Sequence, residues 1–335
     1  MVKDEIRISV VGTGRMGYFH ARLLARLGFL DSVVDINPQI AKKVGQQFDI
    51  QWFSSITALT EERSPNGVIL AVPTNLHSTI ALEIANKIPT LKALLIEKPI
   101  APSVEEAVRL KANLDSKNIC ILVGHIEVFN PVITRIQEVM KQELLGDLRS
   151  ILFQRRGAVA EARIESIGDV YEDIGVHDFD VASRLLPKVK VRLFSTAVKI
   201  NGMDNSSTIV IASEDSNFFA TFLMSREHAG KVRTIEIEGT KATLHADLLS
   251  QMLELRSLEI ARGEKDISAI RIPFSSGEQI KVYGEPLLLE MWNFIDCIKG
   301  KALPIVSIDD GIQALKLVNA ARQSIKLGEV IHVQL

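Results

Sequence analysis

The six residues GTGRMG, Gly12–Gly17, constrain the fold of this chain more than any other feature of its sequence. They follow the apolar run Ile6–Gly12, which is typical of a buried strand, and they lead into a helical pattern from Arg15 to Leu27. A G-x-G-x-x-G pattern between a strand and a helix is the fingerprint of a dinucleotide-binding turn. The chain is therefore predicted to begin with a Rossmann unit.

Each glycine of this fingerprint has a physical reason, and the acidic residue that completes it is present. Gly12 permits a tight turn, Gly14 lets the backbone approach a pyrophosphate, and Gly17 lets the helix pack on the strand. Asp35 ends the second predicted strand, about 20 residues further on, where a carboxylate accepts hydrogen bonds from a ribose. It would repel a 2′-phosphate, so NAD is favoured over NADP, although Arg15 inside the turn keeps NADP open.

Strands and helices continue to alternate through the first third of the chain, which predicts a doubly wound parallel sheet. Dinucleotides lie at the carboxyl ends of such strands. Asn75 and His77 follow one of these ends and have an alternative role as caps of the next helix. The residues predicted to bind the cofactor are Gly12, Thr13, Gly14, Arg15, Met16, Gly17, Asp35, Ala71, Val72, Pro73, Thr74, His77, Glu97 and Lys98.

The pattern changes after about residue 125, where alternating strands become dominant. We expect a Rossmann domain over residues 1–124 and, over residues 125–335, a second α/β domain with a large, open, mostly antiparallel sheet. A helix from about Val170 to Leu186 interrupts the strands early, and two helices, about Glu285–Lys299 and Asp309–Leu327, come near the end. The second domain is predicted to bind the substrate and to form oligomers.

Composition narrows the class of protein. The net charge of −2 over 335 residues and the 5% aromatic content argue against a nucleic-acid-binding protein. Cys120 and Cys297 are the only cysteines and are predicted to be buried thiols, not a disulfide framework or a zinc site. With no run of about 18 apolar residues and no signal-peptide pattern, we expect a cytoplasmic protein without a resident metal.

A second group of polar residues stands in YEDIGVHDFD, Tyr171–Asp180. Asp173 and His177 are four residues apart, so on an α-helix they share one face. A carboxylate beside an imidazole orients it and raises its basicity, which suits a general base. The same spacing also suits a metal pair, or a helix cap with a surface ion pair, but we find no third metal-ligand motif.

Lys98 ends the buried strand of KALLIEKPIA, at the edge of the sheet where the cofactor is expected. A lysine at that edge can donate a hydrogen bond to a substrate oxygen. The alternative is a lysine whose ammonium simply reaches solvent at the strand end.

Four segments together, GTGRMG, AVPTNLH, EKPIA and EDIGVHDFD, resemble the Gfo/Idh/MocA oxidoreductase family, and the resemblance covers nearly the whole chain. It implies that Lys98, Asp173 and His177 are catalytic residues that line the substrate pocket. It also implies a cis peptide bond at Lys98–Pro99.

The segment VGHIEVFNP is similar to the G-x-x-E-R-F-N-P of the nucleotide-sugar branch of the family, notably UDP-N-acetylglucosamine 3-dehydrogenases. That likeness implies that Glu127 and Asn130 bind substrate, but Val128 replaces the usual arginine, which leaves the sugar open. Asn130 before a proline is also a good helix cap. Arg155 and Arg156 end a strand and are further candidates for binding substrate, although alternation allows only one of them to point inward.

The resemblance implies oxidation of a secondary sugar hydroxyl by an NAD-dependent enzyme, most simply a nucleotide-sugar such as UDP-N-acetylglucosamine at C3. A polyol or inositol is the first alternative, and a non-catalytic regulator that senses the dinucleotide is the second. A reductase acting on an imine or a tetrapyrrole is a further alternative, but it has no need for a base such as His177. The family also implies a homodimer or homotetramer that forms through the second domain's sheet.

Overall fold

The chain divides into two compact units. The first unit contains Met1–Ile126 and Leu287–Leu315, and the second contains Glu127–Pro286 and Lys316–Leu335. The first unit is therefore discontinuous in sequence, whereas the sequence predicts one boundary near residue 124. The computed structural model describes residues 6–160, 168–214, 218–258, 279–281 and 284–335.

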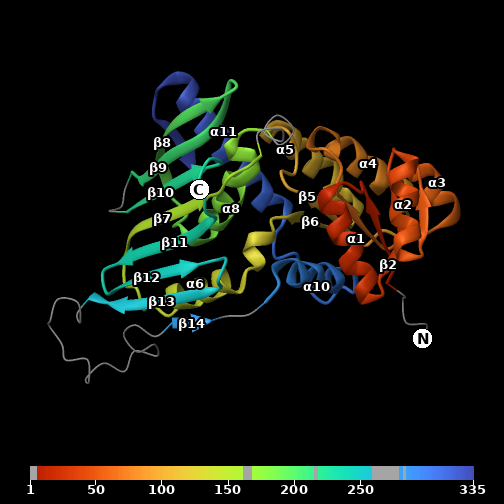
Figure 1. Cartoon of the computed structure of the whole chain (residues 1–335), viewed down its shortest axis with the longest axis horizontal. Helices are drawn as coiled ribbons and strands as arrows, with labels where there is room; N and C mark the ends of the chain where they lie inside the picture. The colour runs from red at the N-terminus through yellow and green to blue at the C-terminus, as the bar shows by residue number, and fades with distance from the viewer. Residues whose placement is uncertain (1–5, 161–167, 215–217, 259–278, 282–283) are drawn as a thin grey trace. The chain divides into compact units, whose positions relative to one another are not determined.

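The first unit is built on a six-stranded parallel sheet with the strand order β3-β2-β1-β4-β5-β6. Figure 1 labels β2, β5 and β6 of this sheet. This is the order of a dinucleotide-binding sheet, and it confirms the predicted Rossmann architecture. The short β3 was not predicted, because two of its three residues are exposed and it lacks an apolar run. The strands are β1 (Ile8–Val11), β2 (Leu30–Val34), β3 (Gln51–Phe53), β4 (Gly67–Leu70), β5 (Ala93–Glu97) and β6 (Cys120–Gly124).

Helices of this unit begin where local chemistry favours them. The side chain of Asn37 accepts hydrogen bonds from the first turn of α2, with Pro38 as its first residue. Ser103 caps α5 by accepting from the backbone N–H of Glu106. The helices are α1 (Arg15–Leu27), α2 (Pro38–Phe48), α3 (Ile56–Glu62), α4 (His77–Lys87), α5 (Val104–Leu114) and α10 (Pro286–Ile298).

The helix α10 belongs to the core of the first unit although it lies far along the chain. Met291, Phe294 and Ile295 are completely buried within the same apolar cluster as β1 and α1. Cys297 on α10 also lies within hydrogen-bonding reach of Cys120 on β6, so the two thiols, both free, form a pair that the sequence does not reveal. The late helix is thus part of what holds the first sheet together.

The second unit is built on a nine-stranded sheet in the order β14-β13-β12-β11-β7-β10-β9-β8-β15. Among the described strands, β7 and β10 pair in parallel and all other neighbours are antiparallel. This confirms the predicted open, mostly antiparallel sheet. The strands are β7 (Leu148–Arg156), β8 (Lys190–Ile200), β9 (Met203–Ser213), β10 (Phe219–Ser225), β11 (Val232–Gly239), β12 (Ala242–Asp247), β13 (Met252–Ser257), β14 (Gln279–Lys281) and β15 (Ile331–Gln334).

One face of this sheet is covered and the other is open. On the covered face Phe153 stacks on Phe222 with ring centroids 4.7 Å apart, and Phe179 of α8 meets Phe222 edge-on at 5.1 Å. Among the described residues, the helices that accompany the sheet (Figure 1) are α6 (Pro131–Lys141), α8 (Val176–Leu185) and the C-terminal part of α11 (Ile308–Leu327). The open face leaves Phe194, Val198, Val210 and Phe219 between 38% and 62% exposed.

The segment MLELRSLEIA is typical of a strand over Met252–Ala261, and the end of this predicted strand lies outside the described residues. In the part of the chain that the structure describes, no helix is both long and apolar enough to cross a bilayer.

Candidate functional site

The glycine turn between β1 and α1 has the geometry of a phosphate-binding cradle. Gly12 has a φ of +86°, and a Cβ there would lie 2.6 Å from the carbonyl oxygen of Ala71. A Cβ on Gly17 would lie 1.8 Å from the carbonyl oxygen of Gly12, so neither position tolerates a side chain. A Cβ on Gly14 would meet nothing within 4 Å, and Gly14 is the N-cap of α1 without a side-chain cap. Free backbone N–H groups at an open helix start suit a pyrophosphate.

Asp35 is held beside this turn by hydrogen bonds that the sequence did not predict. Its Oδ2 accepts from the backbone N–H of Thr13 at 2.8 Å and from the Thr13 hydroxyl at 2.7 Å. Its Oδ1 accepts from the backbone N–H of Asn37 at 2.9 Å. A carboxylate fixed in this way retains lone pairs for ribose hydroxyls, so the residues present fit a dinucleotide. Arg15 and Met16 begin α1, with Arg15 exposed.

His77 connects the carboxyl ends of β4 and β5. Its Nδ1 lies 2.9 Å from the carbonyl oxygen of Pro99, and its Nε2 lies 2.9 Å from that of Val72. Burial lowers the pKa of His77. The hydrogen bonds to the carbonyls of Val72 and Pro99 favour a protonated ring, but their effect is smaller than that of burial. The predicted cofactor residues Ala71 to Thr74 lie in this connection between β4 and α4. His77 therefore braces the segment, and its side chain does not cap α4.

Glu97, at the end of β5, is buried directly before Lys98. Its Oε1 lies 2.6 Å from Nε2 of His20, and its Oε2 accepts from the backbone N–H of Lys98 at 3.2 Å. Burial opposes ionisation of Glu97, but the hydrogen bond from His20 and the charges of His20 and Lys98 outweigh it and lower its pKa. Lys98 is half-buried, and the Lys98–Pro99 peptide bond is cis, which confirms that prediction.

A second buried carboxyl group, that of Glu290 on α10, lies within electrostatic reach of Glu97. Glu290 is 1% exposed, and neither of its carboxyl oxygens has a hydrogen-bond partner among the described residues. Burial, and then the charge of Glu97, raise the pKa of Glu290 well above its usual range. No pattern in the sequence predicts this pair, because the two residues are far apart in the chain.

In the second unit, Arg155 is the centre of a buried ion cluster. Its Nη1 donates to Oε1 of Glu127 at 3.0 Å, and its Nε donates to Oδ1 of Asp178 at 2.9 Å. Arg233, on the neighbouring strand opposite Arg155, donates to the same Glu127 oxygen at 3.0 Å. We call Glu127, Arg155, Asp178 and Arg233 the arginine cluster. Asp178 and Arg233 were not predicted.

The pKa values of the cluster reflect competition between burial and pairing. Burial opposes the charge on Glu127, but Arg155 and Arg233 outweigh it and lower its pKa. For Asp178 the effect of burial is larger than the opposing effect of the Arg155 charge, so the pKa of Asp178 is raised. Burial also lowers the pKa of Arg233, and the nearby Arg155 charge adds to that effect. Arg155 stays charged, since Asp178 and Glu127 outweigh its burial and raise its pKa.

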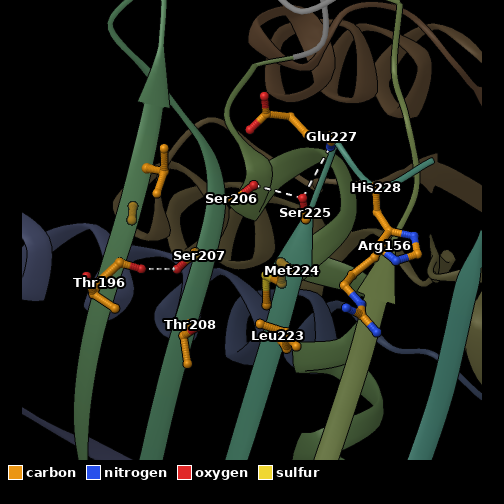
Figure 2. A pocket seen from close by; sticks show the side chains of 12 residues that line it. Arg156, Thr196, Ser206, Ser207, Thr208, Leu223, Met224, Ser225, Glu227 and His228 are labelled. Atoms are coloured by element: carbon orange, nitrogen blue, oxygen red, sulfur yellow. Dashed lines mark hydrogen bonds between the residues drawn. The ribbon is translucent and has the colours of Figure 1, made fainter. Parts of the chain in front are cut away.

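Arg156 lies on the opposite face of the sheet from Arg155, as strand alternation requires. It lines an open pocket over β8, β9 and β10 together with Thr196, Ser206 and His228. Figure 2 shows Arg156 beside His228 on this face. The structure thus separates Arg156 from Arg155 and Glu127, which the sequence analysis also names as candidates for binding substrate.

Asn130 caps the start of α6. Its Oδ1 accepts from the backbone N–H of Val132, and its Nδ2 donates to the carbonyl oxygen of Leu248 at 3.0 Å. Asn130 is therefore the N-cap of α6, which is the alternative that the sequence left open.

Asp173 and His177 lie in consecutive helical segments of different kinds. Asp173 is in a single π-helical turn, η4 (Tyr171–Gly175), and His177 is in the first turn of α8. The sequence predicts one continuous α-helix over both residues. The wider turn is unexpected from sequence spacing, and such π-turns are frequent at functional sites. Asp180, further along α8, is completely buried and has Arg184 at 3.5 Å.

Comparison with known proteins shows that both units match one family of oxidoreductases. Residues 6–125 match the model of the oxidoreductase family with an NAD-binding Rossmann fold, and residues 139–335 match its C-terminal alpha/beta domain. The inositol 2-dehydrogenase of Rhizobium meliloti is 26% identical, over 96% of this chain and 97% of its own. The UDP-N-acetylglucosamine 3-dehydrogenase of Acidithiobacillus ferrooxidans is 29% identical over 53% of each chain.

Solved structures agree on the fold. The structure of the Acidithiobacillus ferrooxidans UDP-N-acetylglucosamine 3-dehydrogenase superposes with a TM-score of 0.82 at 22% identity, covering 96% of this chain and 98% of that one. The WlbA dehydrogenase of Bordetella pertussis, in complex with NADH and UDP-GlcNAcA, gives a TM-score of 0.79 at 16% identity over 99% of each chain. With both domain models matched, this chain belongs to the Gfo/Idh/MocA family of oxidoreductases.

Proposed function

We propose that the chain is an NAD-dependent dehydrogenase that oxidises a secondary hydroxyl of a sugar, with a nucleotide-sugar such as UDP-N-acetylglucosamine, at C3, as the first choice. The observation that carries the proposal is Lys98, half-buried at the carboxyl end of β5 and backed by the ionised Glu97. The carboxyl ends of a sheet with this strand order are where a dinucleotide lies.

The cofactor would be held by the turn Gly12–Gly17, by Asp35, and by the segments after β4 and β5. Bound there, NAD would supply the hydride acceptor that oxidation of a secondary hydroxyl needs. The fixed carboxylate of Asp35 supports NAD over NADP, because it would repel a 2′-phosphate. A thermal-shift titration tests this choice, and a larger stabilisation by NADP than by NAD would contradict it.

Three residues of this chain carry the proposed proton chemistry. His177 takes the proton of the hydroxyl as general base, which is worth about 10²–10⁴-fold in rate. Lys98 donates a hydrogen bond to the same oxygen and stabilises its developing negative charge. Asp173 orients the imidazole of His177 or the sugar.

Two observations bear on the substrate. Glu127 accepts hydrogen bonds from Arg155 and Arg233, and Asn130 caps α6. Both predicted substrate-binding side chains therefore already have partners within the protein. Of the arginine cluster, Arg233 has the most exposed side chain, at 40%, and it is the member best suited to meet a phosphate or carboxylate of the substrate. A polyol or inositol dehydrogenase is the second candidate, favoured by the near-complete coverage of the inositol 2-dehydrogenase match.

The substrate class is tested with a panel of UDP-sugars, free sugars and inositols, with NAD reduction followed at 340 nm. We expect the highest kcat/KM with a UDP-sugar. Preference for an inositol would support the second candidate. Tight NAD binding without turnover on any compound, together with a protein partner, would instead support a dinucleotide-sensing regulator.

The proposed catalytic residues are tested by single substitution. Lys98→Ala and His177→Ala should each lower kcat by at least about a hundredfold, because each removes a group that acts on the reacting oxygen. NAD affinity should change little in His177→Ala. Arg156→Ala, on the open face of the sheet, is the matched control and should keep wild-type kcat. Wild-type kcat in either test variant would remove that residue from the reaction.

We also propose that a second copy of the chain covers the open face of the second unit's sheet. Phe194 and Val210 face each other across β8 and β9 on this face, and Phe219 lies on β10 beside them. Exposed apolar side chains gathered in this way mark interaction surfaces. Phe194→Asp should dissociate the oligomer in size-exclusion chromatography with light scattering. A monomeric wild-type chain would contradict this proposal.

A further inference from the structure

The π-turn η4, which carries Asp173, is anchored by side chains from two remote strands, from the segment after β10 and from the helix α11. The hydroxyl of Tyr171 donates to Oγ of Ser207 on β9 at 3.0 Å and lies 3.4 Å from Oγ of Ser195 on β8. Asp169 accepts, through Oδ1, from the backbone N–H groups of Tyr171 and Glu172. A rare turn is thus kept in place by its surroundings.

Two arginines complete this anchoring, and they differ in what they contact. Arg322 of α11 donates from Nε to Oδ2 of Asp169 at 2.7 Å and has Nη2 2.7 Å from Oε1 of Glu172. Arg226, which follows β10, donates from Nη1 to the carbonyl oxygen of Gly168 at 2.7 Å. The same Nη1 lies 3.7 Å from Oδ2 of Asp173. Of these two arginines, Arg226 is therefore the one that forms an ion pair with Asp173, a residue of the proposed reaction.

Arg226 is also the more demanding of the two to bury. Its side chain is 0% exposed, whereas that of Arg322 is 35% exposed. Its hydrogen bonds go to neutral oxygens, those of Asn205 at 2.8 Å, Asp204 (the backbone carbonyl) at 3.4 Å and Gly168. A buried guanidinium needs a negative partner, and within the described residues Asp173 is the carboxylate that forms an ion pair with it.

We propose that Arg226 is a positioning residue, which holds the Asp173 carboxylate in η4 and limits how strongly its negative charge acts on His177. This inference rests on the proposed function, in which His177 must be neutral to accept a proton. A guanidinium beside Asp173 opposes the field of that carboxylate, so the imidazolium form of His177 is stabilised less. The charge of Asp173 also favours the protonated form of Arg233. The other charged residues around the same turn are Asp169, Glu172 and Arg322.

The test is the titration of His177 in the full-length chain, followed by NMR. The chain has seven histidines, and the His177 signal is identified by its absence in His177→Asn. In Arg226→Gln the midpoint should move to higher pH by about one unit, because the carboxylate is no longer opposed. Arg322→Gln is the matched control, since it removes an ion pair from the same turn but not from Asp173. It should lower Tm and leave the midpoint unchanged.

A double-mutant cycle with Asp173→Asn separates charge from structure. In that background Arg226→Gln should move the midpoint by less than half as much as in the wild type, and Arg226→Lys, which keeps the charge, should leave it near the wild-type value. An unchanged midpoint in a folded Arg226→Gln variant, or equal shifts in both backgrounds, would overturn the proposal.

Folding and activity controls keep the result interpretable. If Arg226→Gln does not fold, Arg226→Met replaces it. Asp173→Asn should then lower Tm, and the double variant Asp173→Asn/Arg226→Met should recover part of that loss. No recovery of Tm would overturn the proposal. With active enzyme, the acidic limb of the pH–kcat profile should move with the midpoint. A wild-type chain that oxidises no sugar would end the proposed function, but the titration would still decide whether Arg226 acts through Asp173.

Discussion

The two units of this protein bury carboxyl groups in opposite ways. In the first unit, Glu290 is buried, and no hydrogen-bond partner reaches its oxygens among the described residues. In the second unit, Glu127 and Asp178 are equally buried but share Arg155. The difference is that burial and the nearby Glu97 favour the neutral form of Glu290, whereas Arg155 and Arg233 favour the ionised form of Glu127.

This contrast has a thermodynamic meaning. A buried ion pair need not stabilise a fold relative to an apolar core, but removing one partner leaves an uncompensated charge. A buried acid that keeps its proton has no such dependence on a partner, and its effect on stability appears only as the pH rises. The two regions should therefore respond very differently to single substitutions and to pH.

The largest expected effect comes from removing the centre of the arginine cluster. Arg155→Met should lower the free energy of unfolding by about 3–5 kcal/mol, because Asp178 would lose its arginine partner while buried and Glu127 would keep only Arg233. Urea denaturation at pH 7 measures it. Arg156→Met, one residue away on the open face, is the matched control and should change stability by less than about 1 kcal/mol. Equal losses in both variants would show that the cluster is not a buried unit.

Glu127→Gln should have the next largest effect, with a pH dependence of defined sign. The pKa of Glu127 is lowered in the folded state, so the unfolded state binds more protons below the usual glutamate range. The stability from its pairing is complete above that range and is lost as the pH falls. The deficit of Glu127→Gln, about 2 kcal/mol at pH 7, should shrink toward pH 4. A constant deficit from pH 7 to pH 4 would contradict the lowered pKa.

Glu290→Gln should show the opposite trend with a smaller amplitude. The pKa of Glu290 is raised in the folded state, so above the usual glutamate range the folded state binds more protons than the unfolded state. Wild-type stability is then lost as the pH rises. A glutamine mimics the neutral acid, so the variant should gain Tm relative to wild type between pH 5 and pH 8, by roughly 2 °C per kcal/mol. No gain would mean that Glu290 ionises freely.

Much of the first unit was predictable from sequence because its signals are local. The glycine turn, Asp35 and the end of β5 each lie within a few residues of the strand that positions them, so spacing along the chain reports spacing in the fold. The cis bond before Pro99 came from the family resemblance and is confirmed. The pair Glu97–Glu290 was not predictable, because contact between β5 and α10 is decided by packing of the whole unit.

The second unit was predictable in outline and less so in its polar contacts. Strand alternation correctly indicated that Arg155 and Arg156 point to opposite faces, but it could not indicate which partners each would meet. Arg226 and Arg233 carried no motif at all. The π-turn at Asp173 was hidden because its sequence has ordinary helical spacing, and tertiary anchoring overrides that local preference.

The discontinuity of the first unit has a consequence for how the protein is made. A ribosome releases the β1–β6 region well before it reaches α10, with the second unit's sheet still to be translated between them. At typical elongation rates the wait is about ten seconds or more. During that interval the surface that Met291, Phe294 and Ile295 later cover is open to water or to chaperones. The nascent Rossmann sheet is thus a half-finished structure whose completion is postponed until late in translation.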